Sequence, residues 1–101
     1  MLVEFMAEWC PSCRAMDDST FNRPDVTSRI ASFIPVRVNV DSQKTVADRY
    51  GATARKYGGI GIPNFLFLDP AGQTLAHRVG FLNSRDFSAL MDSVLSLAPA
   101  R

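Results

Sequence analysis

The stretch LVEFMAEWCPSC, residues 2–13, decides the fold of this chain. Its first eight residues, 2–9, are almost continuously apolar, which is typical of a strand that is covered on both faces. The stretch ends in two cysteines, Cys10 and Cys13, and Pro11 between them suits the first position of a helix. The sequence therefore predicts a buried strand that runs into a helix, with the cysteine pair at the junction.

The rest of the chain continues to alternate between strand and helix patterns. Apolar periodicity predicts helices from Pro11 to about Phe21, from Pro24, over residues 46–57 and after Asn83 or Ser84, with strands over residues 34–40, 65–68 and 74–79. The element order is β-α-β-α-β-β-α, in which the first two strands are parallel and the last two form an antiparallel hairpin. The predicted fold class is α/β, with a mixed four-stranded sheet flanked by helices.

Length and composition narrow the class of protein. A chain of 101 residues corresponds to a single domain, which we assign to residues 1–98, with a C-terminal tail at 99–101. Eleven Lys and Arg against ten Asp and Glu leave a net charge of +1, too little to attract nucleic acid or an anionic membrane. The longest apolar stretch, residues 60–68, is shorter than the roughly 18 residues of a membrane-spanning helix, and the first nine residues do not resemble a secretory signal.

The spacing and position of the two cysteines favour redox chemistry. At the start of a helix, the sulfur of Cys10 faces unpaired backbone N–H groups and the positive end of the helix dipole, which stabilise a thiolate. The sulfur of Cys13 lies one turn further on, close enough to attack a mixed disulfide formed by the first cysteine. This arrangement is typical of a dithiol that exchanges disulfides with another protein.

Three other uses of the pair remain open. Two cysteines supply half of a zinc site, but His77 is the only additional His or Cys in the chain. An iron–sulfur centre would need more cysteines or a dimer, and an inert packed pair would make the intervening proline a coincidence. The strand–Cys-x-x-Cys–helix context favours the redox interpretation, so we expect neither a metal nor an organic cofactor.

Two further positions are candidates for the site. Glu4 lies in the middle of the apolar strand, where burial should raise its pKa so that it can exchange a proton near neutral pH; the alternative is an acid that reaches solvent. Pro63 precedes a fully apolar strand, where an ordinary proline would remove a hydrogen bond. A cis Ile62–Pro63 bond would turn the chain toward the dithiol and leave the backbone of Ile62 to pair with a peptide, whereas a trans turn proline is the alternative.

Several motifs resemble the thioredoxin superfamily. The run EWCPSC, residues 8–13, resembles the thioredoxin active-site signature, and residues 53–63 are similar to the segment that ends in its cis-proline. Residues 19–26 and 80–87 are similar to the C-terminal thioredoxin-like domain of the DsbD family. The resemblance implies a thioredoxin-like fold without the usual N-terminal strand and helix. It also implies a thiol–disulfide oxidoreductase, either a protein-disulfide reductase or an electron relay.

The same resemblance implies roles for individual residues. Cys10 is the exposed attacking cysteine, Cys13 the buried resolving cysteine, and Glu4 the buried acid of the family. The residues expected to face the substrate are Trp9, Pro11, Ser12, Ile62 and Pro63. Trp9 is expected to be partly exposed, with core packing as the alternative. The dipeptide between the cysteines differs from that of thioredoxin itself, and this dipeptide helps to set the reduction potential.

The resemblance also leaves alternatives for function and location. An oxidant or isomerase, a glutathione-dependent enzyme of the same fold and a redox-inert binding module are the other functions considered. The expected partners are protein thiols and disulfides, with an upstream electron donor that the sequence does not identify. The resemblance favours a periplasmic or other extracytoplasmic location over a cytoplasmic one. Residues 34–40 should form an open sheet edge, in a monomer or in a dimer that pairs through this edge.

Overall fold

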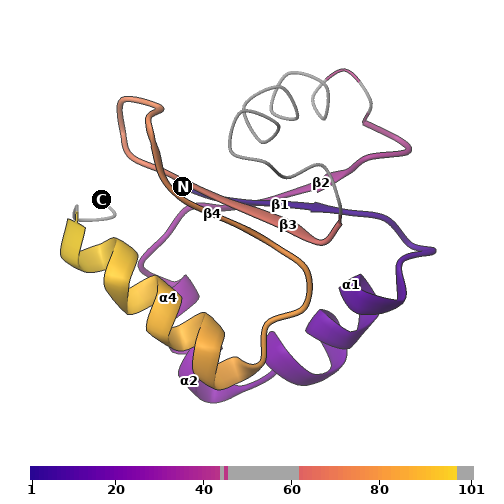
Figure 1. The fold of residues 1–101 in the computed structure, drawn as a ribbon, viewed down its shortest axis with the longest axis horizontal. Helices are drawn as coiled ribbons and strands as arrows, with labels where there is room; N and C mark the ends of the chain where they lie inside the picture. The colour runs from indigo at the N-terminus through magenta and orange to yellow at the C-terminus, as the bar shows by residue number, and fades with distance from the viewer. Residues whose placement is uncertain (44, 46–61, 98–101) are drawn as a thin grey trace.

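The elements of the fold follow the predicted order. The computed structural model describes residues 1–43, 45 and 62–97, so the helix expected over 46–57 and the tail at 99–101 lie outside the described residues. The elements are β1 (Leu2–Met6), α1 (Pro11–Ala15), the π-helical turn η1 (Met16–Thr20), α2 (Pro24–Ile30), β2 (Pro35–Asn39), β3 (Asn64–Leu68), β4 (Thr74–Val79) and α4 (Ser84–Leu97), as Figure 1 shows. No helix in these ranges is long and apolar enough to cross a membrane.

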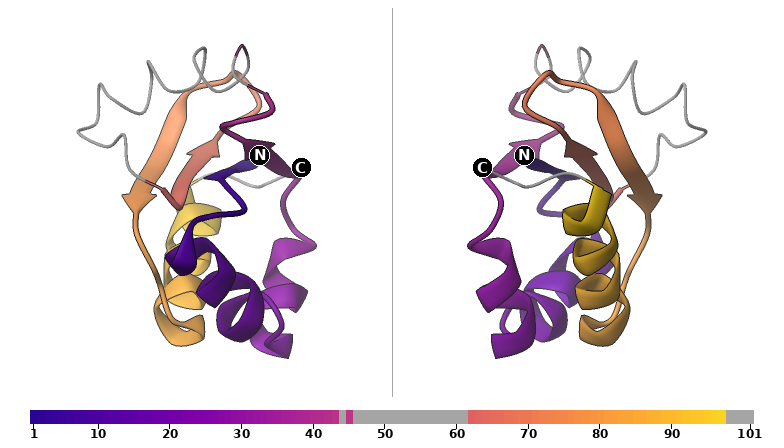
Figure 2. Two further views of the ribbon diagram at one scale, coloured as in Figure 1. Left: turned by 90° about the vertical axis from the view of Figure 1, so that its right-hand side faces the viewer. Right: turned by 90° about the vertical axis from the view of Figure 1, so that its left-hand side faces the viewer.

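The four strands form one mixed sheet in the order β2-β1-β3-β4. β1 is parallel to β2 and antiparallel to β3, and β3 and β4 form an antiparallel hairpin, so the predicted strand directions are confirmed. The helices α1, α2 and α4 lie together on one face of this sheet (Figures 1 and 2). The junction between β1 and α1 is therefore held at one end of the sheet, where the cysteines lie.

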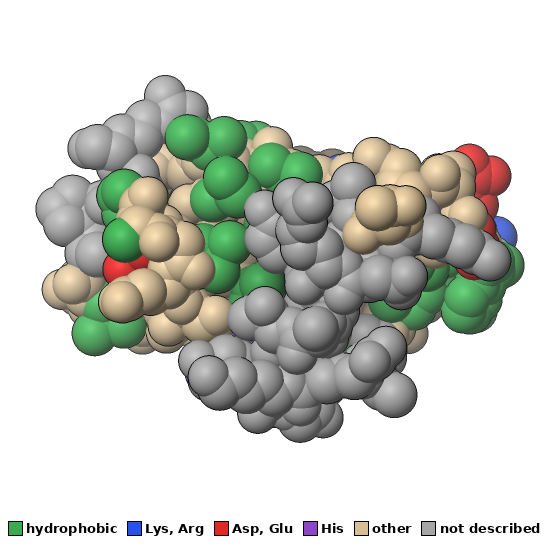
Figure 3. Space-filling view, turned by 90° about the horizontal axis from the view of Figure 1, so that it is seen from above, with side chains coloured by type: hydrophobic (Ala, Val, Ile, Leu, Met, Phe, Trp, Pro, Cys, Tyr) green, Lys and Arg blue, Asp and Glu red, His purple; other side chains and the backbone are tan. Residues whose placement is uncertain are grey.

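The core has a layer on each face of the sheet, because side chains alternate along the central strands. Phe65 and Phe67 of β3 point toward the helices, and the ring of Phe65 packs edge to face on Phe87 of α4 with centroids 5.2 Å apart. Leu66 and Leu68 point to the opposite face. Figure 3 looks onto this second face, where hydrophobic side chains of the described residues reach the surface. The uninterrupted apolar run at residues 65–68 of β3 is thus explained by burial on both faces.

Two boundaries differ from the prediction. β1 ends at Met6 rather than at Trp9, because the chain turns there and the N–H of Cys10 bonds to the carbonyl of Ala7 at 3.2 Å. The helix that begins at Pro11 changes to a π-helical turn at Met16, and the next α-helix begins at Pro24 as expected. The start of α4 is confirmed, since Oδ1 of Asn83 accepts the N–H of Asp86 at 2.8 Å and caps the helix.

β2 lies at an edge of the described sheet and pairs with β1 alone. The open edge is nevertheless shorter than the expected residues 34–40. The N–H of Asn39 donates to Oε1 of Gln43 at 3.1 Å, and the carbonyl of Asn39 accepts the N–H of Gln43 at 2.9 Å. The loop after β2 therefore closes one end of the edge that the sequence predicts to be open.

Candidate functional site

The cysteine pair lies at the start of α1, as predicted. A disulfide joins Cys10 and Cys13, whose Cα atoms are 5.2 Å apart. Cys10 is the N-cap of α1, and its Sγ accepts the backbone N–H of Cys13 at 3.1 Å. Pro11 occupies the first helical turn, where a residue without an N–H leaves no donor unpaired. The helix thus directs a backbone donor at the first sulfur.

The expectation that Cys10 is exposed is wrong for this disulfide form. Cys10 is 3% exposed and Cys13 is 2% exposed. The two cysteines form a small core cluster with Ala7, against which the partly buried side chains of Met6, Val40 and Ile62 pack. Of the two residues between the cysteines, Pro11 is exposed and Ser12 is half-buried. The surface above the sulfurs is therefore formed by neighbouring side chains.

The loop before β3 is brought to the cysteines. The Ile62–Pro63 peptide bond is cis, which confirms the prediction. Ile62 is half-buried in the cysteine cluster, and Pro63 is fully buried. The carbonyl of Pro63 accepts the N–H of Gly80 at 2.8 Å, so the end of β4 holds this loop in place. Sequence segments about fifty residues apart thus meet at the disulfide.

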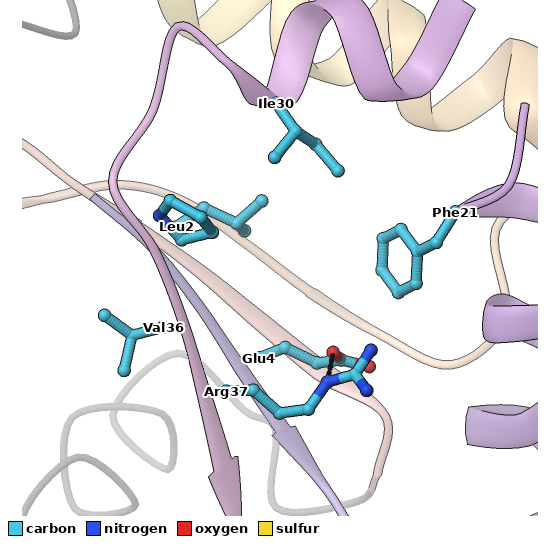
Figure 4. A pocket seen from close by; sticks show the side chains of 7 residues that line it. Leu2, Glu4, Phe21, Ile30, Val36 and Arg37 are labelled. Atoms are coloured by element: carbon cyan, nitrogen blue, oxygen red, sulfur yellow. Dashed lines mark hydrogen bonds and ion pairs between the residues drawn. The ribbon is translucent and has the colours of Figure 1, made fainter. Parts of the chain in front are cut away.

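Glu4 is buried, as the sequence predicts, but it is paired. Its Oε1 accepts Nε of Arg37 on the neighbouring strand at 2.9 Å, and Oε2 is buried without a hydrogen-bond partner among the described residues (Figure 4). Burial raises the pKa of the Glu4 carboxyl above its ordinary value, and the charge of Arg37 partly opposes this rise. Nη2 of Arg37 also contacts Oδ1 of Asp17 at 2.6 Å. Proton transfer by Glu4 stays a prediction.

Trp9 lies at the surface rather than in the core. It is 61% exposed, and its Nε1 donates to Oδ2 of Asp41 at 2.7 Å. Glu8, Trp9 and Asp41 contribute to the wall of an open cavity of about 370 Å³. The exposed indole is therefore oriented by a hydrogen bond to the loop after β2, a contact between residues that are 32 positions apart in the sequence.

Sequence reasoning missed several neighbours of these residues. Arg37 and Asp17 were not among the predicted site residues, and no local pattern marks them as partners of Glu4. Val79 and Phe81 are exposed apolar residues on either side of Gly80, next to the Pro63 loop. In the sequence, the signal for Val79 and Phe81 was an apolar residue on each side of Gly80 at the end of the hairpin.

Residues that could hold a metal do not gather in the described ranges. No group of three or more His, Cys, Asp or Glu side chains could hold one ion there. Nε2 of His77 lies 2.9 Å from Oδ1 of Asn64, in the hairpin.

Comparison with known proteins gives a consistent family match. The family model described as a thioredoxin-like domain matches residues 1–95. The thiol:disulfide interchange protein DsbD of Escherichia coli K12 is 29% identical over 92 residues, which cover 88% of this chain and 16% of that protein. The chain thus spans about a sixth of the length of the curated relatives that it matches.

Solved structures share the fold. The C-terminal domain of Neisseria meningitidis DsbD in the reduced form has a TM-score of 0.71 at 24% identity, over 91% of this chain and 77% of that one. A thioredoxin from Thermus thermophilus has a TM-score of 0.63 at 25% identity, over 95% of this chain and 71% of that one. The described sheet and helices are therefore those of a thioredoxin-like fold.

Proposed function

Because this chain belongs to the thioredoxin-like family, we propose that it exchanges disulfides with protein substrates through Cys10 and Cys13. The observation that carries the proposal is the disulfide at the start of α1, with the N–H of Cys13 directed at the sulfur of Cys10. After reduction, this donor and the helix N-terminus would stabilise a thiolate on Cys10. A thiolate is the form that attacks disulfides.

The proposed reaction moves two electrons in two steps. The thiolate of Cys10 attacks a substrate disulfide, so that a mixed disulfide forms and one substrate thiolate leaves and takes a proton. Cys13 then loses its proton and attacks the sulfur of Cys10, which releases the second substrate thiolate. The products are a reduced substrate and the Cys10–Cys13 disulfide. A thiol donor returns two electrons to restore the dithiol, and neither a metal nor an organic cofactor is needed.

Glu4 is the proposed acceptor for the proton of Cys13. Its carboxyl is buried on β1, the strand that leads into the cysteines, and burial raises its pKa toward the range in which a base can exchange protons at neutral pH. The guanidinium of Arg37 limits this rise and holds the carboxylate by Oε1. Arg37 is therefore a positioning residue for Glu4 in the proposal.

The substrate is proposed to lie over the cysteine cluster. Ile62 packs on this cluster, and Trp9 and Pro11 are exposed at the surface beside it. Ser12 and Pro63 complete the set that we expect to contact a substrate segment. The extracytoplasmic location implied by the resemblance is part of the same proposal.

The direction of electron flow is proposed to be reductive, as a reductase or an electron relay. A reduction potential decides this point. The protein is equilibrated in thiol–disulfide buffers of known potential, and the fraction with free thiols is measured by alkylation and mass. We expect a potential well below the roughly −120 mV of a strong oxidant such as DsbA. A value near that of DsbA would contradict the reductive direction, and a chain that never loses two thiols together would be a redox-inert module.

A second experiment tests the roles of the two cysteines. In the reduced protein, Cys10 should be alkylated first, at pH values below the roughly 8.5 of a free cysteine thiol. The Cys10→Ser and Cys13→Ser variants serve as matched controls, since each leaves one thiol. If Cys13 reacts first in the unmodified protein, the assigned roles are reversed.

A further inference from the structure

Residues 19–26 and 80–87, which are both similar to the DsbD family in sequence, lie against each other in the fold (Figure 1). Oγ1 of Thr20 donates to the carbonyl of Leu82 at 2.6 Å, and the ring of Phe21 packs edge to face on Phe87 with centroids 5.4 Å apart. Thr20 belongs to η1, and Leu82 lies in the loop between β4 and α4. The two stretches therefore form one contact, although its hydrogen-bonded residues are 62 positions apart.

Both backbone polar groups of Leu82 are held by side chains of η1. Its carbonyl accepts the hydroxyl of Thr20, and its N–H donates to Sδ of Met16 at 3.3 Å. Met16 and Thr20 are four residues apart and fully buried, so they face the loop together. Backbone groups that secondary structure does not pair need other partners inside a protein, and here one helical turn supplies both.

The hydroxyl of Thr20 does not bond to its own helix. Oγ of the neighbouring Ser19 donates to the carbonyl of Ala15, four residues back, which is the common bond for a helical Ser or Thr. The corresponding carbonyl for Thr20 is that of Met16, and it accepts the N–H of Phe21 at 2.8 Å in the π-helical turn. The hydroxyl of Thr20 is directed at the loop instead. Such π-helical turns are rare and occur frequently at functional sites.

The loop that Thr20 holds is also fixed to Pro63. The N–H of Gly80, two residues before Leu82, donates to the carbonyl of Pro63 at 2.8 Å. Gly80 has a φ of 99°, a backbone conformation that other residues rarely adopt, at the point where the chain leaves β4. The short segment 80–82 thus bonds to the Pro63 loop at one end and to η1 at the other.

These contacts close a ring that includes the dithiol. The cysteines lead through α1 into η1, η1 holds the loop after β4, this loop holds Pro63, and Ile62 packs back on the cysteine cluster. We propose that Thr20 is a positioning residue for substrate binding. Its hydroxyl holds the loop after β4, and through it the Pro63 loop, at the spacing from the dithiol that a substrate segment needs. This inference rests on the proposed function, in which the substrate contacts Ile62 and Pro63.

The proposal separates substrate binding from thiol chemistry. The sulfur of Cys10 is held by α1, where the N–H of Cys13 is directed at it, and Thr20 takes no part in this contact. Loss of the Thr20 hydroxyl should therefore leave the attack on a small disulfide unchanged. It should slow the attack on a disulfide within an extended peptide, because the peptide backbone needs the Pro63 loop in place.

Reaction of the reduced protein with two disulfides tests this separation. One is a dimer of an extended seven-residue peptide that is linked through a central cysteine, and the other is hydroxyethyl disulfide, which has no peptide backbone. Each reaction oxidises Cys10 and Cys13 to their disulfide and reduces the added disulfide to two thiols, whose release gives the rate. Thr20→Val keeps the shape of the side chain and removes the hydroxyl. We expect it to slow the peptide reaction roughly fivefold, the effect of one hydrogen bond, and the hydroxyethyl disulfide reaction less than about twofold.

Two matched variants separate the hydroxyl from the packing of Thr20. Thr20→Ser keeps the hydroxyl and loses a buried methyl group, so it should lower the stability but keep the peptide rate within about twofold. Ser19→Ala removes a hydroxyl that bonds to its own helix, and it should change neither rate. Urea unfolding of the three variants shows whether the rates follow the hydroxyl or the stability.

Backbone amide exchange in the disulfide form tests the contact itself, without any thiol. In Thr20→Val the amide of Gly80 should exchange roughly fivefold faster, while the amide of Gly72, in the turn at the other end of β4, stays unchanged. Met16→Leu keeps the volume and removes the sulfur that accepts the N–H of Leu82. It should speed exchange of the Leu82 amide and slow the peptide reaction more than the small one, so it decides the question if Thr20→Val does not fold.

Three results would overturn the proposal. They are equal slowing of both disulfides in Thr20→Val, a peptide rate in Thr20→Ser as slow as that in Thr20→Val, and exchange of the Gly80 amide that Thr20→Val leaves unchanged. A failure of the proposed function gives a different result, since the unmodified protein would then react with neither disulfide. The Gly80 amide tests the contact with η1 in either case.

Discussion

The two parallel strands β1 and β2 are neighbours in register, yet their environments are opposite. In β1 only Met6 escapes full burial, whereas in β2 only Val38 is fully buried. The difference arises because β1 has a strand on each side and β2, within the described sheet, has one. Glu4 on β1 and Arg37 on β2 are Cα partners in the parallel pairing of these strands. The pairing therefore places a buried acid beside an exposed base.

The cysteines and the buried acid belong to β1 and its end, whereas β2 is an exposed edge strand of the described sheet. β1 leads into the disulfide, and burial raises the pKa of its Glu4 carboxyl. β2 carries exposed side chains and outward backbone groups. Changes along β1 and at its end should therefore alter turnover or stability more than changes of the exposed side chains of β2 do.

The largest expected effect is a loss of turnover when the cysteines that follow β1 are replaced. Cys10→Ser should reduce catalysed reduction of a protein disulfide to the uncatalysed background, because the attacking sulfur is gone. Cys13→Ser should still attack and should accumulate a mixed disulfide with the substrate, visible as a mass increase that dithiothreitol reverses. Val36→Ala on β2 is the matched change and should leave turnover within about twofold, since Val36 is exposed and surface changes have small effects. A large loss of turnover in Val36→Ala would contradict the difference between the two strands.

The sequence predicts most of the framework because the signals are local. The apolar run before Cys10, the proline after it, the hairpin ending at Val79 and the cap at Asn83 are each set by residues within one or two turns. Those elements were found in the predicted order and directions. The cis bond before Pro63 was also predicted, from a proline placed where a strand should begin.

The contacts that tune the site were not predictable in this way. Arg37 bonds to Glu4 across 33 positions, and Trp9 bonds to Asp41 across 32, so each contact depends on the register of β1 with β2. The burial of Cys10 depends on side chains from distant segments that pack over it. Long-range pairing decides such details, and a single sequence carries no direct signal for it.

A second prediction compares two valines at paired positions of β1 and β2. Val3 on β1 is 1% exposed, and its Cα partner Val36 on β2 is 37% exposed. Val3→Ala should lower the free energy of unfolding by roughly 2 kcal/mol, because it removes buried methyl groups and leaves a cavity. Val36→Ala should change it by less than about 0.5 kcal/mol. Urea unfolding of the two variants measures both values, and equal losses would show that the strands do not differ as described.

A third prediction concerns the pH dependence that Glu4 contributes. Since its folded pKa is raised, the folded chain binds this proton more tightly than the unfolded chain does. The contribution of Glu4 to the free energy of unfolding should therefore be largest at low pH and fall as pH rises from about 4.3, the ordinary glutamate value, through the raised pKa. Glu4→Gln cannot titrate, so its stability relative to the unmodified protein should grow over this range. Urea midpoints of the two disulfide forms, measured from about pH 4 to pH 8, test the sign; a difference that shrinks with pH would contradict it.

The smallest expected effect lies in the contact that joins β2 to η1. The bond between Arg37 and Asp17 is half-exposed at both ends, so Asp17→Asn should change the free energy of unfolding by less than about 1 kcal/mol. Its effect on Glu4 should still be measurable, because the charge of Asp17 raises the pKa of the Glu4 carboxyl and competes for Arg37. Removing that charge should lower the pKa of Glu4. A carbon-detected titration of the Glu4 carboxyl measures the change, with Asp18→Asn as the neighbouring control. Two results would contradict this coupling through Arg37. Either Asp18→Asn shifts the pKa of Glu4 as much as Asp17→Asn does, or Asp17→Asn raises that pKa.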